Sequence, residues 1–260
     1  MAKSDSIGMF DSGVGGTSIF KEIHELMPLE KIIYLADSKN APYGKKTKNE
    51  IIELAYKNTD LLIEMGCKII VVACNTATTN AIDQLREKYN VPFIGIEPAI
   101  KKAALSSSKK SIGVLATKGT LTSKLFSKTS STYTKDIQTI EVVGKGLVEA
   151  IESGKATAAS TSVLLKKIMQ PILEKDIDYL VLGCTHYPYL IPQLEKILPT
   201  RVKIIDSGKA VARQTRSVLK FGNQLAEVQQ DIPEFYTNKN PRILKRFLGD
   251  INCKIRYLNF

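Results

Sequence analysis

Two cysteines stand at the ends of apolar runs, about half a chain apart. Cys74 ends one run in "VVACNTATT", and Cys184 ends another in "YLVLGCTHYP". A thiol donates a proton and its thiolate accepts one, so two opposed thiols can take a proton from one face of a carbon and return one to the other face. Disulfide exchange favours cysteines close together in sequence, and a single nucleophile needs only one. The matched pair therefore indicates racemisation, whereas we interpret Cys67 and Cys253 as packing residues.

The residues after Cys74 would support a thiolate. The segment "NTATTNAIDQLREKY" has the pattern of a helix, so Cys74 is expected close to a helix N-terminus. Amide donors and the positive dipole end of that helix would lower the pKa of the thiol and could also bind a carboxylate. Asn75 and Thr76 add side-chain donors at the same place.

The residues after Cys184 offer different chemistry. Thr185 and His186 bring a hydroxyl and an imidazole beside the second thiol, and "YPYLIPQLEKIL" predicts a continuous helix after them. Imidazole is the side chain most often used as a general acid or base. The two thiols are therefore expected to have different partners.

A glycine-rich loop, "FDSGVGGTS", begins where the first predicted strand ends. Gly13, Gly15 and Gly16 let the backbone turn sharply and approach an anion at the start of the next helix. The spacing matches neither a dinucleotide fingerprint nor a Walker loop. Asp11 and Ser12 place a carboxylate and a hydroxyl at the carboxyl end of the strand, where ligands bind in α/β sheets. We therefore interpret the loop as part of the site.

Apolar strands alternate with helical segments along the chain. Runs rich in Ile and Val predict strands, and a 3.6-residue period predicts helices. The strands are expected over 6–10, 31–36, 68–73, 92–96, 111–116, 138–143, 179–183 and 202–206, and the longer helices over 47–65, 77–89, 159–174 and 208–220. Because nearly every strand position is apolar, each sheet should be covered on both faces. The sequence predicts an α/β fold with mostly parallel sheets.

The two halves of the chain resemble each other. The polar stretch 101–111 separates four predicted strands from four more, "IGMFDSGVGGTSIF" aligns with "IGVLATKGTLTSKLF" 105 residues later, and the two cysteines are 110 residues apart. Chance likeness between two α/β units is the alternative to duplication. We predict two pseudo-symmetric α/β domains, residues 1–98 with about 208–260 and residues 99–207, with the active site in the interdomain cleft.

The composition, 43% hydrophobic and 24% charged, is that of an ordinary globular protein. No stretch reaches the ~20 apolar residues of a membrane span, and the N-terminus lacks the apolar region of a signal peptide, so we expect a cytoplasmic protein with reduced cysteines. Four cysteines without a Cys-x-x-Cys pair and two histidines argue against a metal site. The net charge of +11 comes from scattered lysines, which we interpret as a solvated surface.

Several stretches distributed through most of the chain carry a family resemblance. They are "FDSGVGG", "ADSKNAPYG", "ACNTAT", "GVLAT", "GCTHYP", "IDSG" and "EFYTNKNP". Together they resemble the glutamate racemases, cofactor-independent members of the two-cysteine aspartate/glutamate racemase family that supply D-glutamate for peptidoglycan. Aspartate and hydantoin racemases share the two-cysteine plan, but the "DSGVGG" and "PYG" loops are those of the glutamate branch. The resemblance implies an isomerase that needs no cofactor.

The resemblance also implies a role for each residue of the site. Cys74 and Cys184 would each remove the α-proton of one enantiomer. Asp11 would assist Cys74, and His186 with Glu152 would assist Cys184. The residues expected to hold the amino and carboxylate groups of the substrate are Asp11, Ser12, Pro42, Tyr43, Gly44, Asn75, Thr76, Thr117, Thr120, Thr185 and His186.

Glu149 competes with Glu152 for the role beside His186. Many relatives have a Cys-Pro-x-Phe stretch shortly before the glutamate, whereas this chain has "VGKGLVEAIESG". The two glutamates are three residues apart on the same helix face. We rank Glu152 first because a Glu-x-Gly spacing follows it, as in the family.

The resemblance bears on partners and alternatives as well. It implies glutamate as a small-molecule substrate and a homodimer without membrane contact, and it leaves open a contact with nucleic acid or DNA gyrase, since some family members are reported to act on gyrase. A racemase for aspartate or another amino acid is the alternative within the family. A protein that binds nucleic acid through its +11 charge is the alternative from another class.

Overall fold

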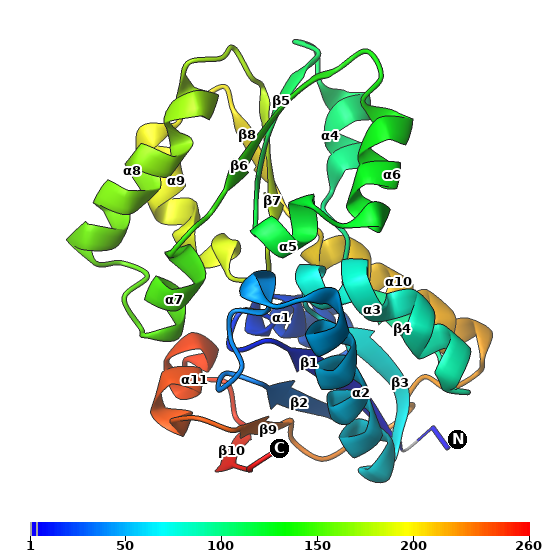
Figure 1. Cartoon of the computed structure of the whole chain (residues 1–260). Coiled ribbons are helices and arrows are strands. Elements are labelled where there is room, and N and C mark those ends of the chain that lie inside the picture. The colour runs from blue at the N-terminus through cyan, green and yellow to red at the C-terminus, as the bar shows by residue number, and fades with distance from the viewer. Residues whose placement is uncertain (1, 4) are drawn as a thin grey trace.

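The computed structural model describes residues 2–3 and 5–260 and has two parts, each built on one sheet (Figure 1). The strands are β1 Ser6–Asp11, β2 Ile32–Ala36, β3 Cys67–Val72, β4 Phe93–Gly95, β5 Ser111–Ala116, β6 Gln138–Val143, β7 Tyr179–Gly183, β8 Lys203–Ile205, β9 Glu234–Thr237 and β10 Lys254–Tyr257. The helices are α1 Thr17–Leu26, α2 Lys48–Glu64, α3 Asn75–Lys88, α4 Ile100–Ser106, α5 Lys118–Leu121, α6 Lys124–Tyr133, α7 Leu147–Glu152, α8 Ala159–Leu173, α9 Ile191–Ile197, α10 Gly208–Phe221 and α11 Pro241–Leu248, with 3-10 turns η1 Tyr43–Lys45 and η2 Tyr187–Leu190. In this described part of the chain, no helix is long and apolar enough to span a membrane.

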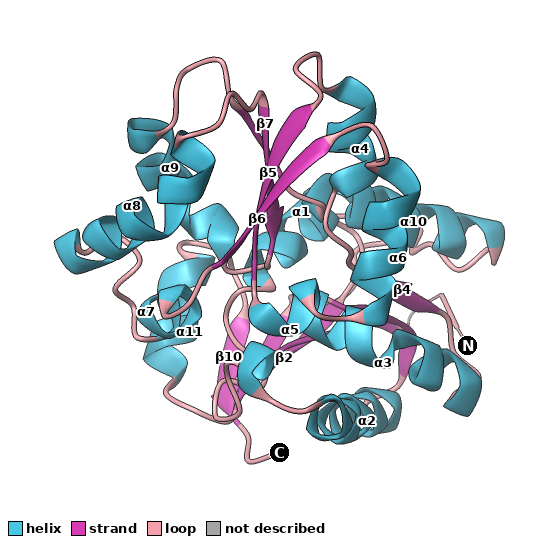
Figure 2. Ribbon diagram, turned by 45° about the horizontal axis from the view of Figure 1, so that its top comes forward, coloured by secondary structure: helices cyan, strands magenta, loops and turns pink. Residues whose placement is uncertain are grey.

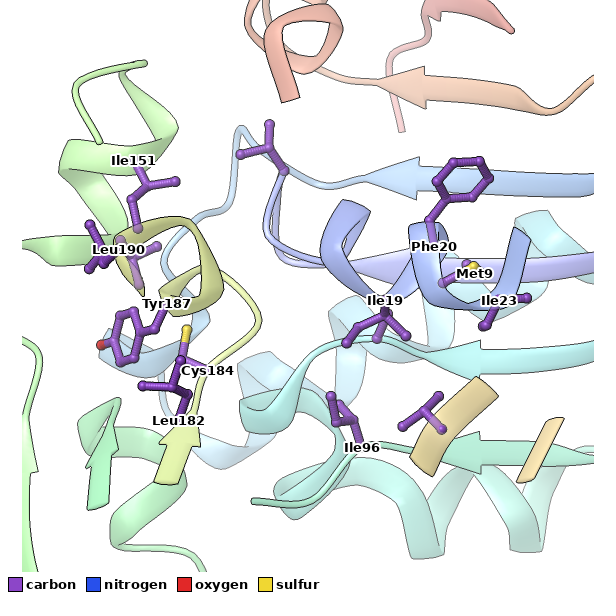
Figure 3. Packing of buried hydrophobic residues seen from close by; sticks show 14 of the residues in the cluster. Met9, Ile19, Phe20, Ile23, Ile96, Ile151, Leu182, Cys184, Tyr187 and Leu190 are labelled. Carbon is purple, nitrogen blue, oxygen red and sulfur yellow. The ribbon is translucent and has the colours of Figure 1, made fainter. Parts of the chain in front are cut away.

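The larger sheet has the strand order β10-β9-β2-β1-β3-β4, and all of its pairings are parallel. Helices α1 and α10 pack on one face and α2 and α3 on the other (Figure 1). Figure 3 shows Phe20 and Ile23 of α1 against Met9 of β1. Because every residue of β1, β2 and β3 is buried, their side chains supply a core on both faces.

The smaller sheet has the order β6-β5-β7-β8 and is also entirely parallel. Helices α4 and α6 lie on one side of it and α8 and α9 on the other (Figure 2). Ile100 and Phe126 pack against Val114 on the first face, and Leu165 and Leu180 lie in the core of the second. The two covered parallel sheets confirm the predicted fold class.

All eight predicted strands are present, with ends that differ by no more than one residue. β9 and β10, which extend the larger sheet beside β2, were not predicted from the sequence. Both have only four residues, and β10 is largely exposed at the edge of the sheet. Short strands with charged residues lack the apolar runs by which the others were found.

The helix predicted after Cys184 is broken into two elements, η2 and α9. Pro188 lies in the first turn of η2 and Pro192 in the first turn of α9. Proline has no N–H to continue a helix and is best tolerated at such a start. Cys184 therefore caps no α-helix, and its thiol lacks the helix-end donors available to Cys74.

The carboxyl ends of strands from both sheets meet at one place. A single cavity is lined by Ser12, Thr117 and Cys184, which directly follow β1, β5 and β7, and by Cys74, which lies two residues after the end of β3. Ligands of open α/β sheets bind beyond these strand ends. Helix α10 packs against α1 on the side of the larger sheet, and we keep residues 1–98 with 208–260, and 99–207, as the proposed extents of the two domains.

Candidate active site

Cys74 is the N-cap residue of α3, which begins two residues earlier than predicted. Its Sγ accepts a hydrogen bond from the backbone N–H of Ala77 at 3.4 Å. Burial raises the pKa of the Cys74 thiol well above its usual value, the charge of Asp11 raises it further, and the N–H of Ala77 only partly opposes this. The helix end alone predicts a lowered pKa for the Cys74 thiol, and burial outweighs that effect. Cys74 is a thiol at rest, with a donor in place for its thiolate.

Asp11 is completely buried beside Cys74. Its Oδ2 accepts a hydrogen bond from the N–H of Gly16 at 2.8 Å, and its Oδ1 accepts one from the hydroxyl of Thr185 at 3.4 Å. Burial raises the pKa of Asp11 to about 6. The charge of His186, the N–H of Gly16 and the Cys74 thiol lower the pKa, but they only partly offset the effect of burial. At neutral pH Asp11 is therefore a carboxylate that accepts the hydrogen bond of the thiol.

Cys184 begins a chain of buried polar groups. Its Sγ lies 3.7 Å from Nδ1 of His186, whose Nε2 lies 2.6 Å from Oε1 of Glu152. Burial favours a lower pKa for His186, but hydrogen bonds with Cys184 and Glu152 outweigh it and raise the pKa well above its ordinary value. His186 is thus an imidazolium that donates to both neighbours and stabilises negative charge on the sulfur. Leu182 and Tyr187 lie beside that sulfur and limit contact with water (Figure 3).

Glu152 is held by two further donors from other segments. Its Oε1 accepts the backbone N–H of Val14 at 2.6 Å, and its Oε2 accepts the hydroxyl of Ser38 at 2.9 Å. Val14 belongs to the glycine-rich loop after β1, and Ser38 follows β2. A carboxylate that accepts hydrogen bonds from several segments is fixed in its orientation. Glu152 therefore orients His186 from a fixed position.

Glu149 lies on the same helix, α7, but faces the surface. It forms an ion pair with Nζ of Lys45, and 38% of its side chain is exposed. Within the described residues, no hydrogen bond joins Glu149 to His186. The geometry therefore favours Glu152 over Glu149 as the partner of the imidazole.

Gly13 and Gly15 allow the two parts of the molecule to approach closely. A Cβ atom on Gly13 would lie 1.9 Å from Oε1 of Glu152, and one on Gly15 would lie 2.2 Å from Nδ1 of His186. Any larger residue would displace these side chains. The glycines thus serve the packing of acid–base groups, which differs from the anion-binding turn expected from the sequence.

Three threonine hydroxyls meet beside the thiols and join the two parts. Oγ1 of Thr76 lies 2.8 Å from that of Thr117 and 3.2 Å from that of Thr120, and the last two are 3.1 Å apart. Thr76 and Thr117 line the cavity, whereas Thr120 is fully buried and does not line it. Each hydroxyl can donate or accept, so this cluster is suited to a carboxylate group.

Asn75 carries a buried acceptor that lacks a partner. Its Nδ2 lies 3.5 Å from the carbonyl oxygen of Ile96, and its Oδ1 has no hydrogen-bond partner among the residues that the structure describes. A buried unpaired oxygen is costly, which makes this atom a candidate acceptor for an ammonium group. The other predicted binding residues that line the same cavity are Ser12, Pro42, Tyr43, Gly44, Thr185 and His186.

Tyr43 contributes less directly than its hydroxyl suggests. The hydroxyl donates to Oδ2 of Asp37 at 2.5 Å and accepts from Nδ2 of Asn58 at 3.1 Å. The side chain is almost fully buried. Tyr43 therefore holds the loop before α2 in place and offers its ring and backbone, but not its hydroxyl, to the cavity.

The cavity that both cysteines line has a volume of about 10 Å³. That is about the space that one water molecule needs. An amino acid does not fit into it, so the two parts have to move apart before such a ligand enters, and their closing then excludes water.

Two residues of the site were not singled out from the sequence. Ser38 donates to Glu152, and Val148 lines the cavity from α7. Ser38 carries the same signal as Asp11 and Ser12, since it is a hydroxyl close behind a strand's carboxyl end. Val148 carries no such signal, because an apolar helix residue is usually a core residue.

Comparison with known proteins adds a second line of evidence. Residues 12–215 match a family model described as Asp/Glu/hydantoin racemase. A glutamate racemase of Pseudomonas paraeruginosa is 43% identical over 248 residues, which cover 95% of this chain and 94% of that protein. A glutamate racemase isoform of Bacillus anthracis superposes with a TM-score of 0.88, 30% identity and 98% of both chains covered. The Escherichia coli glutamate racemase, solved in complex with L-glutamate and an activator, superposes with a TM-score of 0.88, 31% identity and 97% of both chains covered.

Proposed function

The chain belongs to the Asp/Glu/hydantoin racemase family, and from this we propose that it is an isomerase that interconverts L- and D-glutamate by proton transfer at the α-carbon. The observation that carries the proposal is a single cavity lined by Cys74 and Cys184, each with its own acid–base partner. Glutamate is the substrate of the relatives named above. The reaction supplies D-glutamate for peptidoglycan synthesis and is cofactor-independent.

One thiolate and one thiol act in each direction. The thiolate removes the α-proton from one face, and the thiol donates its proton to the opposite face, so the two exchange roles with every turnover. The imidazolium of His186 supports a thiolate at Cys184, while Cys74 keeps its proton. In this state the protein can remove the α-proton of the enantiomer whose α-proton faces Cys184.

The reverse direction needs a thiolate at Cys74. The N–H of Ala77 and the start of α3 stabilise that charge. Asp11 accepts the hydrogen bond of the thiol and is the group to which its proton can pass. Asp11 thus does for Cys74 what His186 does for Cys184, and Glu152 holds His186 in position.

The α-proton of an amino acid is very weakly acidic, so the site must stabilise the charge that develops when the proton leaves. The oxygen of Asn75 is placed for the ammonium group, and the hydroxyls of Thr76 and Thr117 for a carboxylate. Such donors and acceptors act most strongly where water is excluded. Closure of the two parts on the substrate provides that exclusion.

Turnover of four amino acids tests the proposal. Each enantiomer of glutamate and of aspartate is incubated with the protein, and optical activity is followed by circular dichroism. Both glutamate enantiomers should reach an equal mixture, with aspartate slower by at least roughly a hundredfold, as expected where a site distinguishes substrates by buried polar contacts. Absence of glutamate turnover contradicts the proposal, and turnover of aspartate alone identifies the alternative within the family.

Activity should fall in mild acid because of Asp11. The burial that raises the pKa of Asp11 to about 6 means that this carboxylate gains a proton as the pH drops through that value. The protonated group no longer accepts the thiol proton of Cys74, so kcat/KM should decline below about pH 6. A pH profile of kcat/KM measures this, and Asp11→Asn should lower the plateau and remove this acid limb. A wild-type profile that stays flat down to pH 5 contradicts the role given to Asp11.

We also propose a homodimer that acts in the cytoplasm. Both the homodimer and the cytoplasmic location rest on the resemblance to the family. Light scattering after gel filtration should give twice the chain mass of 28.7 kDa. A mass equal to one chain contradicts the dimer.

A further inference from the structure

A wider cavity of about 430 Å³ lies directly outside the cavity between the thiols. The two cavities share Pro42, Gly44, Thr117 and Val148 as lining residues, so the wider one is the vestibule of the site. Its walls come from η1 on the side of the larger sheet and from the segments after β5 and β6 on the other. A molecule bound there touches both parts of the protein before either thiol is reached.

The vestibule is strongly basic. Lys45, Lys46, Lys118 and Lys145 line it, against the single carboxylate of Glu149. Glu149 is paired with Lys45 across the two parts. In the described part of the chain, the other three lysines form no ion pair with a carboxylate. Three positive charges thus remain uncompensated around one hollow.

We propose that this vestibule is an entry site that binds the carboxylates of the incoming amino-acid dicarboxylate through Lys46, Lys118 and Lys145. The inference rests on the proposed function, since it concerns the same substrate. The inner cavity, at about 10 Å³, has no room for glutamate until the two parts separate. The vestibule is large enough to hold the whole molecule during that wait.

Charge explains why the site would capture such a substrate. Glutamate carries two carboxylates and one ammonium group, so it is attracted by an excess of positive potential. A cleft lined by one sign of charge focuses the field and raises the local concentration of an oppositely charged ligand. The attraction acts over about one Debye length and weakens as salt is added. Entry of glutamate should therefore depend on ionic strength.

The test removes the charges without touching the residues assigned to the chemistry. In the variant K46Q/K118Q/K145Q, kcat/KM should fall roughly fivefold to tenfold at low ionic strength for both enantiomers, while kcat stays unchanged. The difference from wild type should shrink below about twofold in 0.5 M salt, where the Debye length is only a few ångströms. Steady-state kinetics across a salt series measures both effects.

A matched control separates the vestibule from net charge. The variant K110Q/K135Q/K175Q removes the same charge from residues that precede β5, β6 and β7, at the opposite end of the smaller sheet. It should keep the wild-type kcat/KM and its salt dependence. An equal loss in the control overturns the proposal, and so does a vestibule variant whose kcat/KM and salt slope match wild type.

Binding of glutarate, a dicarboxylate without an amino group, provides a readout that needs no turnover. Calorimetry at low ionic strength should show glutarate binding to wild type several-fold more tightly than to the vestibule variant. Equal affinities overturn the entry site. Failure of wild type to racemise glutamate overturns the proposed function instead, while the glutarate comparison still decides on the vestibule.

Discussion

Cys74→Ala and Cys184→Ala should each abolish racemisation of glutamate while the chain stays folded. Each thiol serves one face of the α-carbon, and no third thiol lines the cavity. Because general acid–base groups contribute roughly a hundredfold to ten-thousandfold, kcat should fall by at least about a hundredfold. Optical activity assays measure kcat, and a thermal melt checks the fold.

The remaining cysteines provide a control for the loss of a thiol. Cys253 is half-buried, outside the cavity, and has no acid–base partner assigned to it. Cys253→Ala should keep kcat within about twofold of wild type, as is usual for substitutions away from the site. Substantial activity in Cys74→Ala or Cys184→Ala contradicts the two-thiol account, because it means that one thiol suffices.

Glu152→Gln should lower kcat by roughly a hundredfold, the lower end of the range for groups that support proton transfer. The carboxylate holds the proton on Nε2 of His186 and is itself fixed by Val14 and Ser38. Glutamine keeps the shape but removes the negative charge, so His186 loses the group that favours its imidazolium form. The stabilisation that His186 gives to a thiolate at Cys184 is therefore weaker in this variant.

Glu149→Gln is the matched comparison, because it makes the same change three residues away on α7. Its side chain pairs with Lys45 at the surface, so kcat should remain within about threefold of wild type. Kinetics of the two variants side by side decide between the glutamates. A larger loss for Glu149→Gln than for Glu152→Gln contradicts the assignment.

The sequence predicted those parts of the fold that depend on local patterns. Apolar runs marked the eight strands, because a strand covered on both faces needs apolar residues at nearly every position, although β6 and β8 are mostly not buried. The same reasoning found Cys74 and Cys184 at strand ends, and the structure brings both to one cavity. β9 and β10 were missed because both are short and partly polar; β10 is the edge strand, and β9 lies between it and β2.

The details of the site depend on tertiary contacts that no local pattern contains. Glu149 and Glu152 differ by about 60° around α7, and only the docking of that helix on the glycine-rich loop decides which carboxylate meets His186. Tyr43 was expected in the site and lines the cavity, but its hydroxyl is engaged by Asp37, which begins the same loop after β2. The prolines after Cys184 were visible in the sequence, and their effect on the helix was overlooked.

The most direct test of the two-thiol account is the origin of the α-hydrogen in the product. L-glutamate is converted in deuterated water, and the first few per cent of D-glutamate is isolated and examined by mass spectrometry. If one thiol takes the proton and the other returns a solvent-derived one, the product should carry deuterium at the α-carbon from the first turnover. Product that retains the original hydrogen contradicts the account, since it means that a single group both removes and returns the proton.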